Sequence, residues 1–299
     1  MLSLCLIAAA QGLPSSGAAT APAVATAPSP VATAWAPIDP KVRRLYEHGL
    51  ELMSAGALLE ARAELSEAFF SGSLDAARSK RALEALTELA DKTLFSPLVY
   101  ENDPYTSAYR VARGDVIQKI VEREKLLVSP AFIGLLSGVN PGRLQPGQLL
   151  KLLRGPVHAV VSKSDFTMDL YLQREGQPRT FVKRLKVGLG KDGSTPAGAW
   201  LVGKKTSRAR WTPPASASQT ATVAWGQAGY PLGKEGYWIA LQGVGDDTRG
   251  LSGYGLHGTN EPDSIGKAAS LGCVRLADED IELAYRLLAE KASTVTIRP

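Results

Sequence analysis

The spacing of apolar residues changes along the chain from a helical to an alternating pattern. In residues 41–95 apolar side chains recur every three or four positions, which predicts helices on both sides of Gly56. A further helix is expected over residues 74–94. A single helical unit of this kind cannot bury its own apolar face, so we expect it to pack on a neighbouring part of the chain or on a protein partner.

Residues 105–153 combine short apolar runs with frequent turns. Ser129 precedes Pro130, and this pair is typical of a helix start, because proline fits the first helical position. We expect the order strand, helix, helix, strand, with the elements at 109–111, at 117–121, from Ser129-Pro130 onward, and at 149–153.

Residues 155–299 are rich in strand patterns and turns. The sequence predicts a mostly β domain with one late helix over 278–291, for which Asp278 is the expected N-cap. The expected strands are a pair within 158–172, one at 179–187, one at 238–241 and one at 295–297.

Composition and charge exclude several classes of protein. The chain has 299 residues, of which 44% are hydrophobic, so it can fill ordinary cores and is not disordered as a whole. After the N-terminus there is no run of about 18 apolar residues, which excludes a polytopic membrane protein. The net charge of +5 is mild, and the basic residues are not clustered, so we expect no nucleic-acid partner. An anionic polymer or surface is the binding partner that this charge suits better.

The first 40 residues have the pattern of an export segment and a linker. Met1–Ala10 is apolar and ends in three alanines, as a secretory signal does at its cleavage site, although the usual basic start is absent. Residues 11–40 are rich in Ala, Pro, Thr and Ser. We therefore expect an exported protein of the periplasm or cell wall, with membrane tethering as an open alternative.

The few cysteines and histidines provide no scaffold and no metal site. The two cysteines cannot build a disulfide framework, and with the three histidines they show no metal-ligand spacing. We expect no metal and no organic cofactor. His48 and His158 are interpreted as structural.

His257 and Cys273 form the one constellation that points to chemistry. They lie 16 positions apart, and Gly255, Gly258 and Gly272 flank them. A cysteine nucleophile needs a base that holds or generates its thiolate, and histidine is the usual one. We expect the thiol to be held ionised beside the imidazole, with the backbone amides of Gly272 and Cys273 forming an oxyanion hole.

The surrounding sequence resembles the signature of the L,D-transpeptidase (YkuD) family. The matching segments are His257-Gly258-Thr259, Ser270-Leu271-Gly272-Cys273-Val274-Arg275-Leu276, Thr195-Pro196-Ala197-Gly198, Pro231-Leu232-Gly233 and Ser264-Ile265-Gly266. Two positions depart from the family pattern, because Leu271 replaces a frequent second histidine and Tyr230 replaces a common asparagine.

The resemblance implies roles for individual residues. Cys273 would be the nucleophile and His257 its proton acceptor, oriented by a backbone carbonyl near Gly258. The Gly272 and Cys273 amides would stabilise the oxyanion, with help from Tyr254. Ser270 and Arg275 would shape the site or bind a peptide carboxylate. For Arg275 the alternative is a structural ion pair, and for Tyr254 it is packing. Trp211 and Trp238 are interpreted as core or rim residues rather than as platforms for a ligand.

The implied reaction is cross-linking of peptidoglycan stem peptides. The thiol would attack the carbonyl of the third stem residue, release D-Ala and pass the acyl group to an amine of a neighbouring stem. Water as acceptor would make the protein an L,D-carboxypeptidase, and a protein amine would make it an anchoring enzyme. A catalytically inactive peptidoglycan-binding scaffold is the alternative from another class.

Two N-terminal regions resemble binding modules. Residues 105–153 resemble LysM, a βααβ module whose family binds N-acetylglucosamine polymers, although Val116 stands where Thr or Ser is usual. Residues 45–69 resemble one tetratricopeptide unit, which suggests a protein partner. We therefore predict a multidomain α+β chain with four parts: a signal-like segment and linker (1–40), a tetratricopeptide-like helical hairpin (41–97), a LysM-like module (105–153) and a mostly β L,D-transpeptidase catalytic domain with a C-terminal helix (155–299).

Overall fold

The computed structural model describes residues 38–213 and 221–299. The expected signal-like segment and all but the last three residues of the expected linker lie outside the described residues. Among the described residues, no helix combines the length and apolar character needed to cross a membrane.

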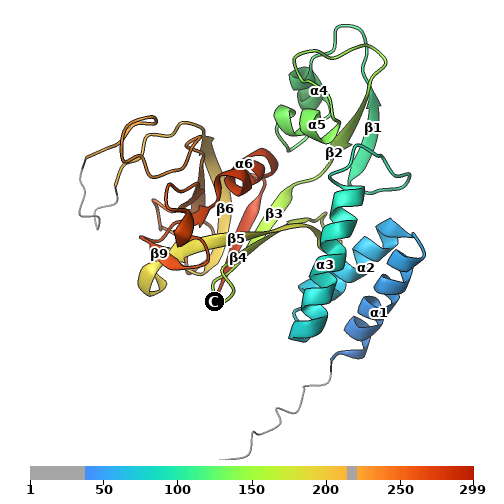
Figure 1. Cartoon of the computed structure of the whole chain (residues 1–299), viewed down its shortest axis with the longest axis horizontal. Coiled ribbons are helices and arrows are strands. Elements are labelled where there is room, and N and C mark those ends of the chain that lie inside the picture. The colour runs from blue at the N-terminus through green and yellow to red at the C-terminus, as the bar shows by residue number, and fades with distance from the viewer. Residues whose placement is uncertain (1–37, 214–220) are drawn as a thin grey trace, which may run out of the picture. The chain divides into compact units, whose positions relative to one another are not determined.

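Three helices open the described part of the chain, as the periodicity predicts (Figure 1). Asp39 accepts a hydrogen bond from the backbone N–H of Lys41 at the start of the first helix, which has Pro40 at its first position. Gly56 follows that helix with φ +81°, a backbone conformation that favours glycine. The helix expected over residues 74–94 is present as the third, so residues 41–97 hold one helix more than the hairpin named in the predicted fold class. The bounds are α1 Pro40–Ser54, α2 Leu58–Phe70 and α3 Ala76–Thr93.

The next elements follow in the expected order of strand, helix, helix and strand. Ser129 caps the second of these helices by accepting a hydrogen bond from Phe132 N at 3.2 Å. The first strand begins three residues before its predicted start, because it pairs along the whole length of the antiparallel second strand. The bounds are β1 Thr106–Arg110, α4 Ile117–Arg123, α5 Pro130–Leu136 and β2 Leu149–Leu153.

A nine-stranded sheet forms the body of the C-terminal region, so the prediction of a mostly β domain is confirmed. The strand order is β10-β8-β7-β6-β11-β3-β4-β5-β9, and β10 also pairs with β5, which makes the sheet barrel-like. Figure 1 shows the long strand β5 running between this body and the N-terminal helices. The bounds are β3 Val157–Ser162, β4 Thr167–Leu172, β5 Thr180–Gly190, β6 Gly198–Thr206, β7 Trp238–Gly243, β8 Gly255–His257, β9 Ala268–Ser270, β10 Val274–Leu276 and β11 Thr294–Arg298.

The late helix α6 spans Asp278–Leu287 and differs in detail from its prediction. The N-cap is Ala277, not Asp278, whose carboxylate instead accepts a hydrogen bond from Lys234 N at 3.0 Å. Leu288 has extended dihedral angles, so the helix ends before the predicted Lys291. Asp278 therefore ties the start of α6 to the loop before β7.

The N-terminal helices bury their apolar face against the chain's own sheet. The rings of Phe69 and Phe181 meet edge to face with centroids 5.9 Å apart, and Ser66 Oγ accepts a hydrogen bond from Phe181 N at 3.0 Å. Strand β5 is thus the neighbour that a single helical unit requires. A protein partner for this region stays a prediction.

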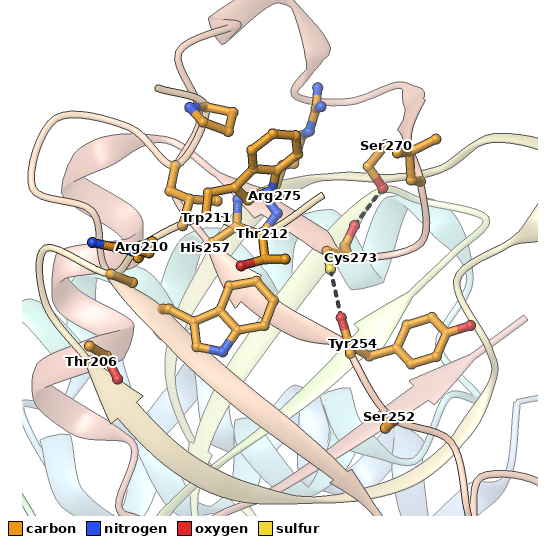
Figure 2. Close-up of a pocket in the computed structure, with 16 residues that line it drawn as sticks. Thr206, Arg210, Trp211, Thr212, Ser252, Tyr254, His257, Ser270, Cys273 and Arg275 are labelled. Carbon is orange, nitrogen blue, oxygen red and sulfur yellow. Dashed lines mark hydrogen bonds between the residues drawn. The ribbon is translucent and has the colours of Figure 1, made fainter. Parts of the chain in front are cut away.

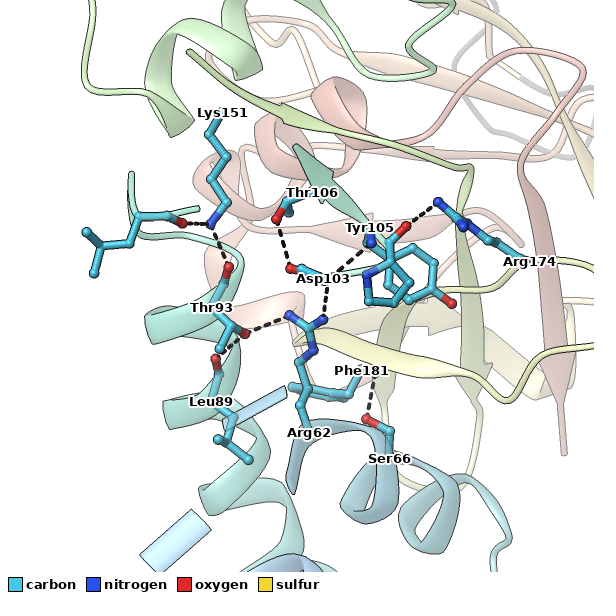
Figure 3. A network of polar contacts seen from close by, with 12 residues as sticks. Arg62, Ser66, Leu89, Thr93, Asp103, Tyr105, Thr106, Lys151, Arg174 and Phe181 are labelled. Atoms are coloured by element: carbon cyan, nitrogen blue, oxygen red, sulfur yellow. Dashed lines mark hydrogen bonds and ion pairs between the residues drawn. The ribbon is translucent and has the colours of Figure 1, made fainter. Parts of the chain in front are cut away.

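A buried polar network joins these helices to the strand, helix, helix, strand unit (Figure 3). We call Arg62, Thr93, Asp103 and Lys151 the Lys151 network. Arg62 donates to Asp103 at 2.9 Å and to Thr93 Oγ1 at 2.7 Å. Lys151 Nζ donates to three backbone carbonyls, at 2.6, 3.0 and 2.6 Å, in and after the last turn of α3. Every N–H of this ammonium is therefore satisfied inside the protein.

Candidate active site

Two short parallel strands bring the predicted catalytic residues together. Strand β8 ends at His257, and β10 begins directly after Cys273. The two strands pair in parallel with Arg275 opposite His257 and Val274 opposite Leu256. This register places Cys273 and His257 beside the same pocket, whose walls include both residues.

The backbone fixes the orientation of the His257 imidazole. The side chain is buried, and Nδ1 lies 2.6 Å from the carbonyl oxygen of Gly258. Because a carbonyl can only accept, Nδ1 carries the proton, and Nε2 keeps its lone pair. The backbone carbonyl that holds this imidazole belongs to Gly258.

Trp238 covers one face of the imidazole. The two rings stack with centroids 5.6 Å apart and an interplanar angle of 16°. They meet because Trp238 lies directly opposite His257 in the β7–β8 pairing. A Cβ at Gly255 would lie 2.6 Å from the indole, so glycine is needed there. The sequence offered no signal for this contact, since it depends on strand register.

Ser270 and Gly272 build the turn that presents the thiol. Gly272 has φ +133°, and a Cβ there would lie 2.9 Å from the Tyr254 ring. The buried Ser270 Oγ accepts a hydrogen bond from Gly272 N at 3.1 Å and donates one to Cys273 O at 2.7 Å. One prediction is therefore corrected, because the Gly272 amide is occupied by Ser270 and is not free for an oxyanion. The Ser270 hydroxyl shapes the turn, which is the first of the two roles expected for it.

Burial makes both reactive groups neutral. It lowers the pKa of His257 to about 4 and raises the pKa of the Cys273 thiol to about 11, and the backbone of Gly255 and the positive charge of Arg275 offset that rise only in part. The Cys273 Sγ lies 3.6 Å from the carbonyl oxygen of Gly253. The pKa of the thiol therefore contradicts the expectation of an ionised resting sulfur, because burial disfavours the thiolate.

The pocket is a cleft of about 530 Å³ in which Cys273 lies opposite Tyr254 (Figure 2). Trp211 and Trp238 also line this cleft. Gly258 and Gly272 support it through their backbones and do not line it.

The two remaining predicted residues lie at the pocket wall with partners of their own. Arg275 forms an ion pair with Glu261 at 2.6 Å, as its structural interpretation predicts. The Tyr254 ring packs on Trp200 with centroids 5.4 Å apart. Within 38–213 and 221–299, no group of three or more His, Cys, Asp or Glu side chains is arranged to hold a metal ion. His158 bonds Thr294 Oγ1 at 2.8 Å, in keeping with a structural role.

Known proteins resemble this chain in sequence. The family described as YkuD, L,D-transpeptidase catalytic domain, matches residues 156–297. YkuD of Bacillus subtilis strain 168 is 30% identical over 188 residues, which cover 59% of this chain and 90% of the relative. YkuD of Bacillus licheniformis is 26% identical over 198 residues, which cover 64% of this chain and 98% of the relative.

Among solved structures, L,D-transpeptidase 3 from Mycobacterium tuberculosis is 13% identical, with a TM-score of 0.35. The alignment covers 52% of this chain and 76% of that one. The assignment rests on the sequence matches, not on this limited structural likeness. By its sequence, the chain belongs to the YkuD L,D-transpeptidase family.

Proposed function

We propose that this protein is an exported peptidoglycan L,D-transpeptidase that uses Cys273 as nucleophile and His257 as general base. The observation that carries the proposal is the pair itself: the thiol and a neutral imidazole, with its Nδ1 proton bound to a backbone carbonyl, line one cleft. An imidazole fixed in this way offers Nε2 to a proton from the thiol.

Acylation follows from the neutral state of both groups. As Cys273 Sγ bonds to the carbonyl carbon of the third stem residue, its proton passes to His257 Nε2. The tetrahedral intermediate then collapses, the C–N bond to D-Ala breaks, and the imidazolium returns its proton to the leaving amine. A thioester and free D-Ala result, and two lower barriers replace one high barrier.

Transfer reverses the roles of the same two residues. An amine of a neighbouring stem attacks the thioester, and His257 accepts the proton that this amine loses. The C–S bond breaks, an amide cross-link forms, and the sulfur recovers a proton from the imidazolium. Of the two amides predicted for the oxyanion hole, that of Cys273 remains as the donor to the oxyanion, because Ser270 occupies the other.

Incubation with purified muropeptides, followed by mass spectrometry of the products, tests this proposal. Cross-linked dimers with loss of D-Ala are expected from the wild-type protein. Shortened stems without dimers would identify a carboxypeptidase, and stems attached to a protein would identify an anchoring enzyme. Unchanged turnover by Cys273→Ala would refute the catalytic assignment.

Residues 105–153 are proposed to hold the enzyme on glycan, which raises the local concentration of stems. Deletion of this unit is a poor test, because Lys151 connects it to α3. Val116 is exposed in the turn before α4 and is a better site for substitution. Sedimentation with purified sacculi should weaken for Val116→Asp, whereas Val244→Asp, at an exposed site outside this unit, should bind as the wild type does.

A further inference from the structure

The charged side chains on the walls of the active-site cleft are all basic. Among the described residues that line it, Arg210 and Arg275 are the only ones with a formal charge at neutral pH, and none is Asp or Glu. A cleft lined by one sign of charge concentrates ligands of the opposite sign. This cleft therefore favours an anionic substrate.

The two arginines differ in whether their charge is already balanced. Arg275 is mostly buried and paired with Glu261. The Arg210 side chain is exposed and makes no hydrogen bond or ion pair with another described residue. Residues 1–37 and 214–220, which complete the chain, contain no Asp or Glu. Arg210 is thus a cation of the cleft that lacks a carboxylate partner within its own chain.

The backbone holds Arg210 in place from both sides. Ala209 N donates to Gly236 O at 3.0 Å, and Trp211 exchanges two hydrogen bonds of 2.9 Å with Val223. Figure 2 shows Arg210 and Cys273 on opposite sides of His257. An arginine anchored by its backbone on the wall of this cleft can reach a remote part of a peptide whose carbonyl lies at the thiol.

We propose that Arg210 binds a carboxylate of the donor stem peptide and makes the cleft selective for anionic peptides. A guanidinium presents two parallel N–H groups to a carboxylate, and such charge-assisted bonds are stronger than neutral ones. Trp211 and Trp238 line the same cleft and add apolar surface to it. The inference rests on the proposed function, since it names what the same site selects.

A substrate series with matched variants tests the inference. Three stem tetrapeptides are compared: one with all carboxylates free, one with the carboxyl group of the leaving residue amidated, and one with the carboxyl groups of the preceding residues amidated. Each is assayed with the wild type, Arg210→Gln, Arg210→Lys and the control Arg81→Gln. Arg81 is an exposed arginine on α3, so its loss changes the net charge equally.

On the free peptide, kcat/KM should fall about tenfold for Arg210→Gln, mainly through KM, and should stay near wild type for Arg81→Gln. Arg210→Lys should recover part of the loss. The Arg210→Gln effect should vanish on one amidated peptide, and that peptide identifies the bound carboxylate. An equal loss on all three peptides, or the same loss in Arg81→Gln, would overturn the inference.

Failure of this inference differs from failure of the proposed function. If the wild type turns over none of the three peptides, the proposed function fails and the inference falls with it. If the wild type is active and Arg210→Gln matches it on every peptide, only the role of Arg210 is refuted.

Discussion

Two buried polar clusters of this protein differ in how completely their hydrogen bonds are satisfied. In the Lys151 network the ammonium donates to three carbonyls, and Arg62 and Asp103 pair at 2.9 Å, both nearly without exposure to solvent. In the active-site pair, His257 uses one ring nitrogen, and the Cys273 thiol has only a contact of 3.6 Å. Burial lowers the pKa of Lys151 only to about 8, so its ammonium stays largely charged at neutral pH, whereas burial holds the active-site pair neutral.

The difference in hydrogen bonding indicates a structural role for the Lys151 network and a chemical role for the pair of Cys273 and His257. In the Lys151 network the ammonium is fully bonded and only the buried Arg62 Nε lacks a hydrogen-bond partner, so the network has little to offer a ligand. It joins α2, α3 and β2. An unsaturated pair beside a cleft leaves a lone pair on Nε2 and a proton on sulfur, which are the groups that acyl transfer requires. Substitutions in the first cluster should therefore affect stability, and those in the second should affect catalysis.

The largest effect is expected for His257→Gln. Loss of the base should lower kcat by about 10² to 10⁴-fold, with little change in the midpoint of urea unfolding at neutral pH. His158→Gln is the matched control, because His158 also stacks on an aromatic ring but lies outside the cleft. Equal loss in both variants, measured by D-Ala release, would remove the distinction between the two histidines.

Lys151→Met should show the opposite behaviour. The substitution leaves three carbonyls without their donor, so the free energy of unfolding should fall by about 2 kcal/mol. Activity per folded molecule should remain. Lys119→Met, at an exposed site on α4, should leave urea unfolding unchanged. An active-site defect in folded Lys151→Met would show that the two clusters are coupled.

The pH dependence of kcat/KM should report the pKa of His257. The base must be neutral, so activity should be lost as the pH falls through about 4, well below the ordinary histidine value of about 6.5. Trp238→Leu removes the stacked indole and admits water. It should move this acid limb upward by about one to two pH units, while Trp238→Phe should move it less.

Arg275 and Cys273 also face the imidazole, and both variants retain them. Their influence therefore cancels in the comparison of Trp238→Leu with wild type. If the wild-type kcat/KM were lost near pH 6.5, or if Trp238→Leu did not shift the pH at which kcat/KM is lost, burial would not set the basicity of His257.

The smallest effect is expected for Ser270→Ala. The change removes one hydrogen bond to Gly272 and one to Cys273 O, so the turn should hold the sulfur less firmly. We expect kcat to fall about tenfold, which corresponds to roughly 1.4 kcal/mol. Ser270→Thr keeps the hydroxyl and should retain more activity, measured in the same D-Ala assay. Full activity of Ser270→Ala would show that the turn needs no such support.

Local patterns predicted much of the fold and singled out the candidate pair of Cys273 and His257. The helices of 41–95 and the cap at Ser129 follow from spacing and turn chemistry, which are local. Cys273 and His257 stood out because glycines and a family signature surround them.

What the sequence could not provide depends on contacts between distant segments. Trp238 stacks on His257 only because β7 and β8 pair in one register. Lys151 lies in an apolar strand and is buried because its ammonium reaches the end of α3, 58 residues earlier in the chain. Asp278 was wrongly expected to cap its own helix, because its bond to Lys234 spans 44 residues.

Acylation of the thiol tests the central claim most directly. The protein is exposed to a carbapenem, which the family resemblance implies as a mimic of the donor, and its intact mass and modified peptide are measured. The account predicts one adduct on the wild-type protein, located at Cys273, none on Cys273→Ala, and slow formation on His257→Gln. An adduct of equal yield on Cys273→Ala, or equal rates for wild type and His257→Gln, would contradict it.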